Sequence, residues 1–151
     1  MKIIIDADAC PVVDIALSVA AEQKLECILI CDTAHMIQRD GYKTVTVDKG
    51  NDSADFRLVN MLERGDIAVT QDYGLAAMCL SKKAYAINQN GLIYSDKNIE
   101  QLLFTRYVSK KVRAAGGRTK GPSKRTHEQD EAFRSALIKL IKDNENHQPS
   151  D

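Results

Sequence analysis

No apolar stretch of this sequence is long enough to cross a membrane as a helix. Such a helix needs about 20 consecutive apolar residues, and the apolar runs here, such as residues 3–5 and 27–31, are far shorter. The first residues also lack a basic-then-apolar leader with a small-residue cleavage site, because the chain enters a predicted strand at once. These absences predict a cytoplasmic protein that makes no membrane contact.

Zinc-binding patterns are missing as well. The four cysteines include no Cys-x-x-Cys pair, and the three histidines do not stand at zinc spacing to them. Cys27 and Cys31 lie in an apolar run, so we expect buried, reduced thiols. Cys10 stands beside a predicted helix start, where the pKa of a thiol tends to fall. A nucleophilic Cys10 is therefore one reading, although no histidine is near it in the sequence to act as its base.

Acidic residues are absent from residues 106–125, although the whole chain has 21 acidic and 21 basic residues. Eight lysines and arginines fall in that segment, whereas residues 1–105 hold fifteen acids and ten bases. Segregation of this kind says more about partners than the net charge of zero does. Basic side chains without intervening acids neutralise backbone phosphates, which gives affinity for nucleic acid without sequence reading. A solvated connector between two helices is the plainer alternative.

Short apolar runs alternate with helix-period segments along the chain. Strands are predicted at residues 2–5, 27–31, 44–47, 67–70 and 84–87. Helices are predicted to start at Pro11, near Asp52, at Tyr73, at Ser95 or Asp96, and at Thr126. This alternation predicts an α/β fold with three layers, a mostly parallel sheet of about five strands and a C-terminal helix.

The length of 151 residues suits one domain with one core. We expect this domain to span residues 1–143, with a basic loop at 109–125 and the C-terminal helix at about 126–143. The polar end of the chain, residues 144–151, is expected to be a frayed tail.

Aspartates gather where predicted strands end or predicted helices begin. Asp6 and Asp8 follow the first strand, and Asp72 follows the fourth. Asp52 and Asp55 open the helix before that fourth strand. In open α/β sheets, ligands bind outside the carboxyl ends of the strands, at the point where the strand order reverses. If the first and fourth strands are neighbours at that point, these carboxylates converge on one edge of the sheet.

Convergence of the aspartates requires something to offset their repulsion. Two carboxylates about 4 Å apart repel by roughly 1 kcal/mol in water and about 4 kcal/mol at a protein-like dielectric constant. Hard divalent ions such as Mg²⁺ or Mn²⁺ prefer oxygen ligands and would offset that repulsion. Such an ion, with a substrate phosphate in its shell, can activate a water molecule. The plainer reading is that each aspartate caps the helix beside it.

Four separated stretches resemble one bacterial family. "IIIDADACPV", "KGNDSADFRLVN", "VTQDYGLAA" and "GGRTKGPSKRT" are similar, in this order, to the YaiI/YqxD family over roughly residues 2–142. That family is largely uncharacterised and is regarded as similar to PIN-like nuclease domains, whose acids bind Mg²⁺ or Mn²⁺ and cleave RNA. The resemblance implies that Asp6, Asp55 and Asp72 hold the metal. PIN-like nucleases often have a fourth acid soon after the third, whereas none follows Asp72 here until Asp96; Asp8 could supply that charge.

Three functional readings follow from the aspartates and the resemblance. The first is a metal-dependent nuclease acting on RNA, with Asp6, Asp8, Asp55 and Asp72 as catalytic residues. Its phosphate contacts would come from six basic residues: Lys111, Arg113, Arg118, Lys120, Lys124 and Arg125.

The second reading is a phosphatase, because "IIIDADAC" resembles the apolar strand and Asp-x-Asp of the haloacid dehalogenase superfamily. Asp6 would then be the nucleophile and Asp8 the acid–base, but no late acid pair follows a strand to bind the metal. The third reading is a non-catalytic nucleic-acid-binding domain with an eroded acidic pocket. All three leave a homo-oligomer open.

Overall fold

The computed structural model describes residues 1–32, 39–48, 53–116 and 124–147, without the side chains of Ser53, Asn146 and His147. The elements within these residues are, in chain order, β1 (Lys2–Asp6), α1 (Val13–Glu22), β2 (Glu26–Asp32), β3 (Lys43–Val47), α2 (Ser53–Met61), β4 (Ile67–Val69), α3 (Tyr73–Ser81), β5 (Tyr85–Ile87), α4 (Asp96–Ala114) and α5 (His127–His147). The predicted α/β class is confirmed. None of the helices in these residues has the length and apolarity that crossing a bilayer requires.

The described strands form one parallel sheet in the order β3-β2-β1-β4-β5. β1 lies at its centre, with Ile4 opposite Ile28 of β2 on one side and opposite Ala68 of β4 on the other. β2 and then β3 lie on one side of β1, and β4 and then β5 lie on the other. The strand order therefore reverses between β1 and β4, and the predicted adjacency of the first and fourth strands is confirmed.

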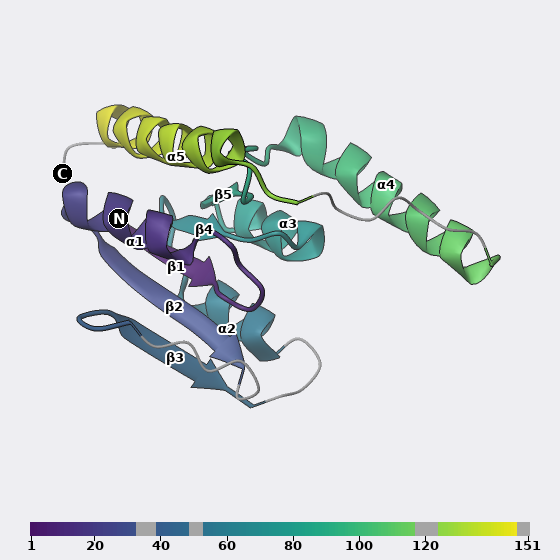
Figure 1. Cartoon of the computed structure of the whole chain (residues 1–151), viewed down its shortest axis with the longest axis horizontal. Coiled ribbons are helices and arrows are strands. Elements are labelled where there is room, and N and C mark those ends of the chain that lie inside the picture. The colour runs from purple at the N-terminus through teal and green to yellow at the C-terminus, as the bar shows by residue number, and fades with distance from the viewer. Residues whose placement is uncertain (33–38, 49–52, 117–123, 148–151) are drawn as a thin grey trace.

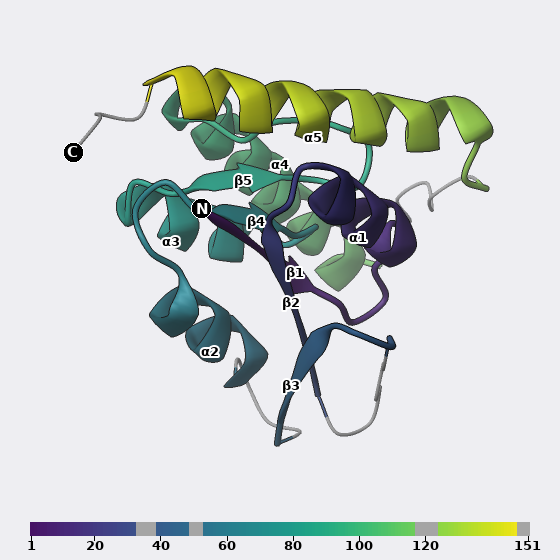
Figure 2. The same cartoon turned by 90° about the vertical axis from the view of Figure 1, so that its left-hand side faces the viewer.

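Helices cover both faces of the sheet, which gives the three predicted layers (Figure 1, Figure 2). α1 and α5 pack together on one face, and α2, α3 and α4 lie on the other. Side chains alternate along β1, so that Ile3 and Ile5 are buried with α1 and α5, whereas Ile4 is buried with α2 and α3. This alternation decides which layer the residue at the end of β1 faces.

The start of α1 differs from the prediction. The helix begins at Val13, and Pro11 precedes it. The chain turns before the helix, because the amide of Cys10 donates to the carbonyl of Ala7 at 3.2 Å and Ala9 has a φ of +57°. The starts of α3 at Tyr73 and of α4 behind Ser95 agree with the prediction.

Two boundaries near the C-terminus also differ from the prediction. The expected basic loop at 109–125 is helical up to Ala114, so Lys111 and Arg113 stand on the last turns of α4. The expected tail from residue 144 continues as helix α5 up to His147. Asn144 is buried there and its side-chain amide donates to the carbonyl of Gly65 at 2.8 Å. The end of the helix is therefore tied to the loop before β4.

Candidate active site

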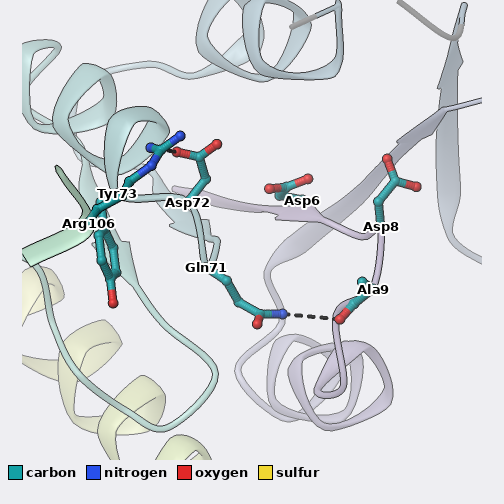
Figure 3. A pocket seen from close by; sticks show the side chains of 7 residues that line it. All are labelled: Asp6, Asp8, Ala9, Gln71, Asp72, Tyr73 and Arg106. Carbon is teal, nitrogen blue, oxygen red and sulfur yellow. Dashed lines mark hydrogen bonds and ion pairs between the residues drawn. The ribbon is translucent and has the colours of Figure 1, made fainter. Parts of the chain in front are cut away.

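Three of the predicted aspartates line one pocket at the carboxyl edge of β1 and β4. This pocket, which we call the acidic pocket, has a volume of about 360 Å³. Its lining residues are Asp6, Asp8, Ala9, Gln71, Asp72, Tyr73 and Arg106 (Figure 3). The pocket opens where the strand order reverses, which is the position expected for a ligand site in this kind of sheet.

Asp6 occupies the middle of the acidic pocket, between the loops that follow β1 and β4 (Figure 3). As the last residue of β1 it shares the sheet face of Ile4 and so lies on the side of α2 and α3. Its carboxylate accepts a hydrogen bond from Thr70 Oγ1 at 2.9 Å. Burial raises the pKa of Asp6 to about 6; the Thr70 hydroxyl opposes that rise, and the charges of the other three aspartates add to it, led by Asp55.

Asp72 has a structural task in addition to its place in the pocket. It is the N-cap of α3, and its Oδ1 accepts hydrogen bonds from the amides of Gly74 at 2.8 Å and Leu75 at 3.2 Å. The same oxygen pairs with Arg106 Nη1 at 3.4 Å. The capping interpretation is therefore correct for Asp72. The same carboxylate that caps α3 also lines the pocket.

Asp8 and Asp55 reach the site from two further elements. The carboxylate of Asp8 accepts from the amide of Asp32, at the end of β2, with distances of 3.2 and 3.3 Å. Asp55 stands in the first turn of α2 and does not line the pocket, yet its charge acts on Asp6 more strongly than that of Asp8 or Asp72. Asp52 lies outside the described residues.

The acids do not form a closed metal cage. Within the residues that the structure describes, no group of three or more His, Cys, Asp or Glu side chains is arranged to hold a metal ion. The chemistry of the donors still suits Mg²⁺ or Mn²⁺, because they are carboxylate oxygens and the charges of the other three aspartates reach Asp6 strongly enough to help raise its pKa. Mg²⁺ usually keeps several waters and binds through one or two carboxylates together with substrate phosphate. Coordination of that kind, by one or two carboxylates, fits the acidic pocket better than a cage made by the protein alone.

Arg106 is a charged pocket residue that the sequence did not predict. Ile99 is buried, and Leu102 and Leu103 are half-buried against the α2 and α3 side of the core. Arg106 follows these residues at helical spacing and so continues the face of α4 that meets the domain. That spacing was visible in the sequence. It places Arg106 in the pocket only once it is known that α4 packs on α3 beside Asp72.

Gln71 joins the two loops that form the pocket floor. Its side-chain amide donates to the carbonyl of Ala9 at 3.1 Å, which ties the loop after β4 to the loop after β1 (Figure 3). Ala9 has its φ in the left-handed region, which costs a residue with a side chain roughly 1–2 kcal/mol. No sequence signal marked either residue, since the bond joins positions 62 apart.

The six predicted phosphate contacts fall into three groups. Lys111 and Arg113 are exposed on the last turns of α4, and Lys124 is exposed just before α5. Arg125 instead has protein partners at Asp130, at the side chain of Asn90 and at the carbonyl of Gln89. Its guanidinium holds the loop after β5 against α5. Arg118 and Lys120 lie outside the described residues.

Cys10 is a poor nucleophile. Burial raises the pKa of Cys10 to about 11, and the charge of Asp6 adds to the rise. A thiol in that state carries almost no thiolate at neutral pH, which removes support from the reading of Cys10 as a nucleophile. Cys27 and Cys31 are buried free thiols, as predicted.

The fold and the acidic pocket define an α/β domain with a carboxylate-lined site where its strand order reverses. A profile of the family described as "Uncharacterized BCR, YaiI/YqxD family" matches residues 4–143. The chain belongs to this family.

Relatives of high identity span nearly the whole chain. A UPF0178 protein of Ruminiclostridium cellulolyticum is 57% identical over 143 residues, which cover 94% of this chain and 93% of the relative. A UPF0178 protein of Exiguobacterium sibiricum is 50% identical over 141 residues, covering 93% and 96%. These names assign no activity. No solved structure matches the chain, so the likeness to PIN-like domains stays a prediction.

Proposed function

We propose that this protein is a metal-dependent nuclease that hydrolyses RNA phosphodiesters in the acidic pocket. One observation carries the proposal: Asp6, Asp8 and Asp72, from two distant parts of the chain, line one pocket together with a cation, Arg106. Carboxylates that crowd one another attract a divalent cation, and an arginine beside them attracts phosphate. A phosphodiester with Mg²⁺ or Mn²⁺ satisfies both groups at once.

Asp6, Asp55 and Asp72 are the residues that would hold the ion. When bound, Mg²⁺ or Mn²⁺ supplies a water of lowered pKa and positive charge for the leaving oxygen. Without an ion the pKa of Asp6 is raised to about 6, so its carboxylate is available as a ligand above that pH and holds a proton below it. Asp8, fixed by the amide of Asp32, adds negative charge on the β2 side of the pocket.

Arg106 would contact a phosphate of the substrate. Its side chain is 56% exposed although it pairs with Asp72, so the guanidinium has further donors to offer. Lys110 and Arg113 follow at four and seven residues along α4 and therefore continue the helix face of Arg106. At 1.5 Å per residue, Arg113 stands about 10 Å beyond Arg106. This basic face favours a polymer over a small phosphate ester, because it offers cations beyond the reacting group.

The test uses purified protein with millimolar Mn²⁺, a labelled single-stranded RNA and a chromogenic phosphate monoester. We expect the RNA to be cleaved and the monoester to persist. Asp6→Asn should remove the cleavage, whereas Asp40→Asn, which neutralises an exposed aspartate outside the pocket, should keep it. Turnover of the monoester instead of RNA would support the phosphatase reading, in which Asp6 is the nucleophile.

One observation favours a second candidate, a nucleic-acid-binding domain without catalysis. Asp72 already caps α3 and pairs with Arg106, so a carboxylate expected to bind metal has local partners. RNA retained without cleavage, equally by wild type and by Asp6→Asn, would support this candidate and refute the nuclease. Loss of retention in Arg106→Gln would then place the RNA at the same pocket.

A further inference from the structure

The outer face of α4 carries exposed apolar side chains. Phe104 is 65% exposed, Tyr107 56%, Val108 41% and Val112 39%. Phe104, Val108 and Val112 stand four residues apart, so they form a stripe along one side of the helix. At about 100° per residue, Phe104 and Val108 each lie about 160° round the helix from Arg106, so the stripe faces away from the acidic pocket.

Among the residues that the structure describes, little covers the second half of α4. Its apolar packing on the α2 and α3 side of the core comes from Ile99, Leu102 and Leu103 in the first half. From Phe104 to Gly116 every residue is exposed except Ser109, which is half-buried. Figure 1 shows this part of α4 extending beyond the sheet. Helices are marginal in water without tertiary packing, and contiguous exposed apolar patches mark interaction sites.

We propose that the outer face of α4 binds the same face of a second copy of this chain, with the two helices antiparallel. The charged residues that flank the stripe favour a second copy of the chain as the partner. Glu100 and Lys111 are exposed and eleven residues apart, which is about three turns, so both flank the stripe on the same side. A two-fold axis across an antiparallel helix pair brings equivalent flanks together. Glu100 of each copy then faces Lys111 of the other, while Phe104 meets Tyr107.

The same face fits nucleic acid less well. Bases stack on aromatic rings, but Val108 and Val112 offer aliphatic surface, and Glu100 would repel phosphate. The cations aligned with the pocket, Arg106, Lys110 and Arg113, are on the other side of the helix. Lys111 stays close to the stripe, with Nζ 5.5 Å from the ring centre of Tyr107, where it can meet an acidic partner.

The dimer should be weak. One helix pair of this length falls at the low end of stable interfaces, which bury about 1,200 Å² or more in total. We expect a dissociation constant in the micromolar range, with sensitivity to salt because the flanking charges are exposed. The proposal does not depend on the nuclease activity, since the stripe and the acidic pocket lie on different sides of α4.

The test is sedimentation equilibrium at low salt over a range of protein concentrations, with two charge reversals. Glu100→Lys alone and Lys111→Glu alone should each weaken the dimer by on the order of tenfold, because each puts like charges together at both ends of the pair. An equimolar mixture of the two variants should dimerise about as well as wild type, because opposite charges then meet at both ends. The double variant should do the same by itself.

Both changed residues are exposed on one helix, so melting temperatures should remain within a few degrees of wild type. A wild type that stays monomeric at all concentrations overturns the proposal, and so do single variants that dimerise like wild type. Failure of the mixture to restore the dimer overturns the antiparallel pairing. A monomeric wild type that loses RNA binding on Phe104→Ala would assign the face to nucleic acid instead.

Discussion

Replacing Asp6 with asparagine should stabilise the protein at neutral pH while removing the carboxylate at the middle of the pocket. Asparagine has nearly the same shape, and its side-chain oxygen can still accept from Thr70 Oγ1. What it removes is a charge that burial and three neighbouring aspartates disfavour. The carboxylate thus lowers the stability of the folded protein, as expected at a functional site.

The size of the effect follows from the pKa. In the folded protein the pKa of Asp6 is about 6 rather than its ordinary 3.8, and each unit corresponds to about 1.4 kcal/mol. The charge thus destabilises the folded state by up to about 3 kcal/mol above pH 6. Water reaching the pocket and relaxation of the neighbours reduce this, so we expect about 1–2 kcal/mol. For a chain of this length the melting temperature should rise by about 2–8 °C.

The size of this stabilisation depends on pH. Below about pH 4, Asp6 is protonated in both the folded and the unfolded wild type, so the variant gains little. Between pH 4 and pH 6, the folded protein keeps a proton that the unfolded chain releases, and the stability of the wild type falls as pH rises. The advantage of the variant therefore grows through this window and is constant above it.

The assay is thermal unfolding followed by circular dichroism at pH 4.5 and pH 7.5, in EDTA so that no divalent ion contributes. Asp40→Asn is the matched control and should change the melting temperature little at either pH, because Asp40 is exposed. A lower melting temperature of Asp6→Asn at pH 7.5, or an equal effect at both pH values, would show that the charge of Asp6 does not destabilise the folded protein.

Three further changes test other parts of the structure. Gly91→Ala should reduce the free energy of unfolding, measured in urea, by about 2 kcal/mol or more. The new Cβ would lie 2.7 Å from the carbonyl oxygen of Ala132, and the φ of residue 91 is +89°. Unchanged stability would contradict that close approach. Asn144→Ala should cost about 1–2 kcal/mol in the same assay by leaving the carbonyl of Gly65 unpaired, and no loss would mean that this end of α5 frays as the sequence suggested. Arg106→Gln should weaken RNA binding and reduce the salt dependence of that binding by about one phosphate contact. It should tighten Mn²⁺ binding several-fold, because a competing cation is gone. Loss of both RNA binding and Mn²⁺ binding would contradict the assignment of Arg106 to phosphate.

The sheet and three of the site aspartates could be predicted because local sequence determines them. Strand ends are visible in "KIIID" and "IAVT", and the α/β pattern leaves few positions for the first and fourth strands. Asp6 and Asp72 therefore lie at the same carboxyl edge of the sheet, as expected. The cap at Asp72 was equally visible, but sequence could not show that a capping carboxylate would also line the pocket.

The missed features depend on contacts between distant segments. Arg106 matters because α4 packs on α3 beside Asp72, which no local pattern states. The end of α5 is polar and suggested a tail, yet Asn144 is buried against the loop at Gly65, 79 residues away. The basic loop was expected from residue 109, whereas the first part of this segment has enough helix formers, such as Lys110 and Lys111, to extend α4 to Ala114, just before the glycine pair at 116 and 117.

Thermal unfolding with added Mn²⁺ tests the central claim, that crowded carboxylates in the acidic pocket bind a divalent cation. An ion that binds only the folded state must raise the melting temperature. We predict a rise at pH 7.5 that increases with Mn²⁺ concentration, is smaller at pH 5.0, where Asp6 holds a proton, and is lost in Asp6→Asn. Absence of a rise in the wild type, or an equal rise in Asp6→Asn, would contradict the account.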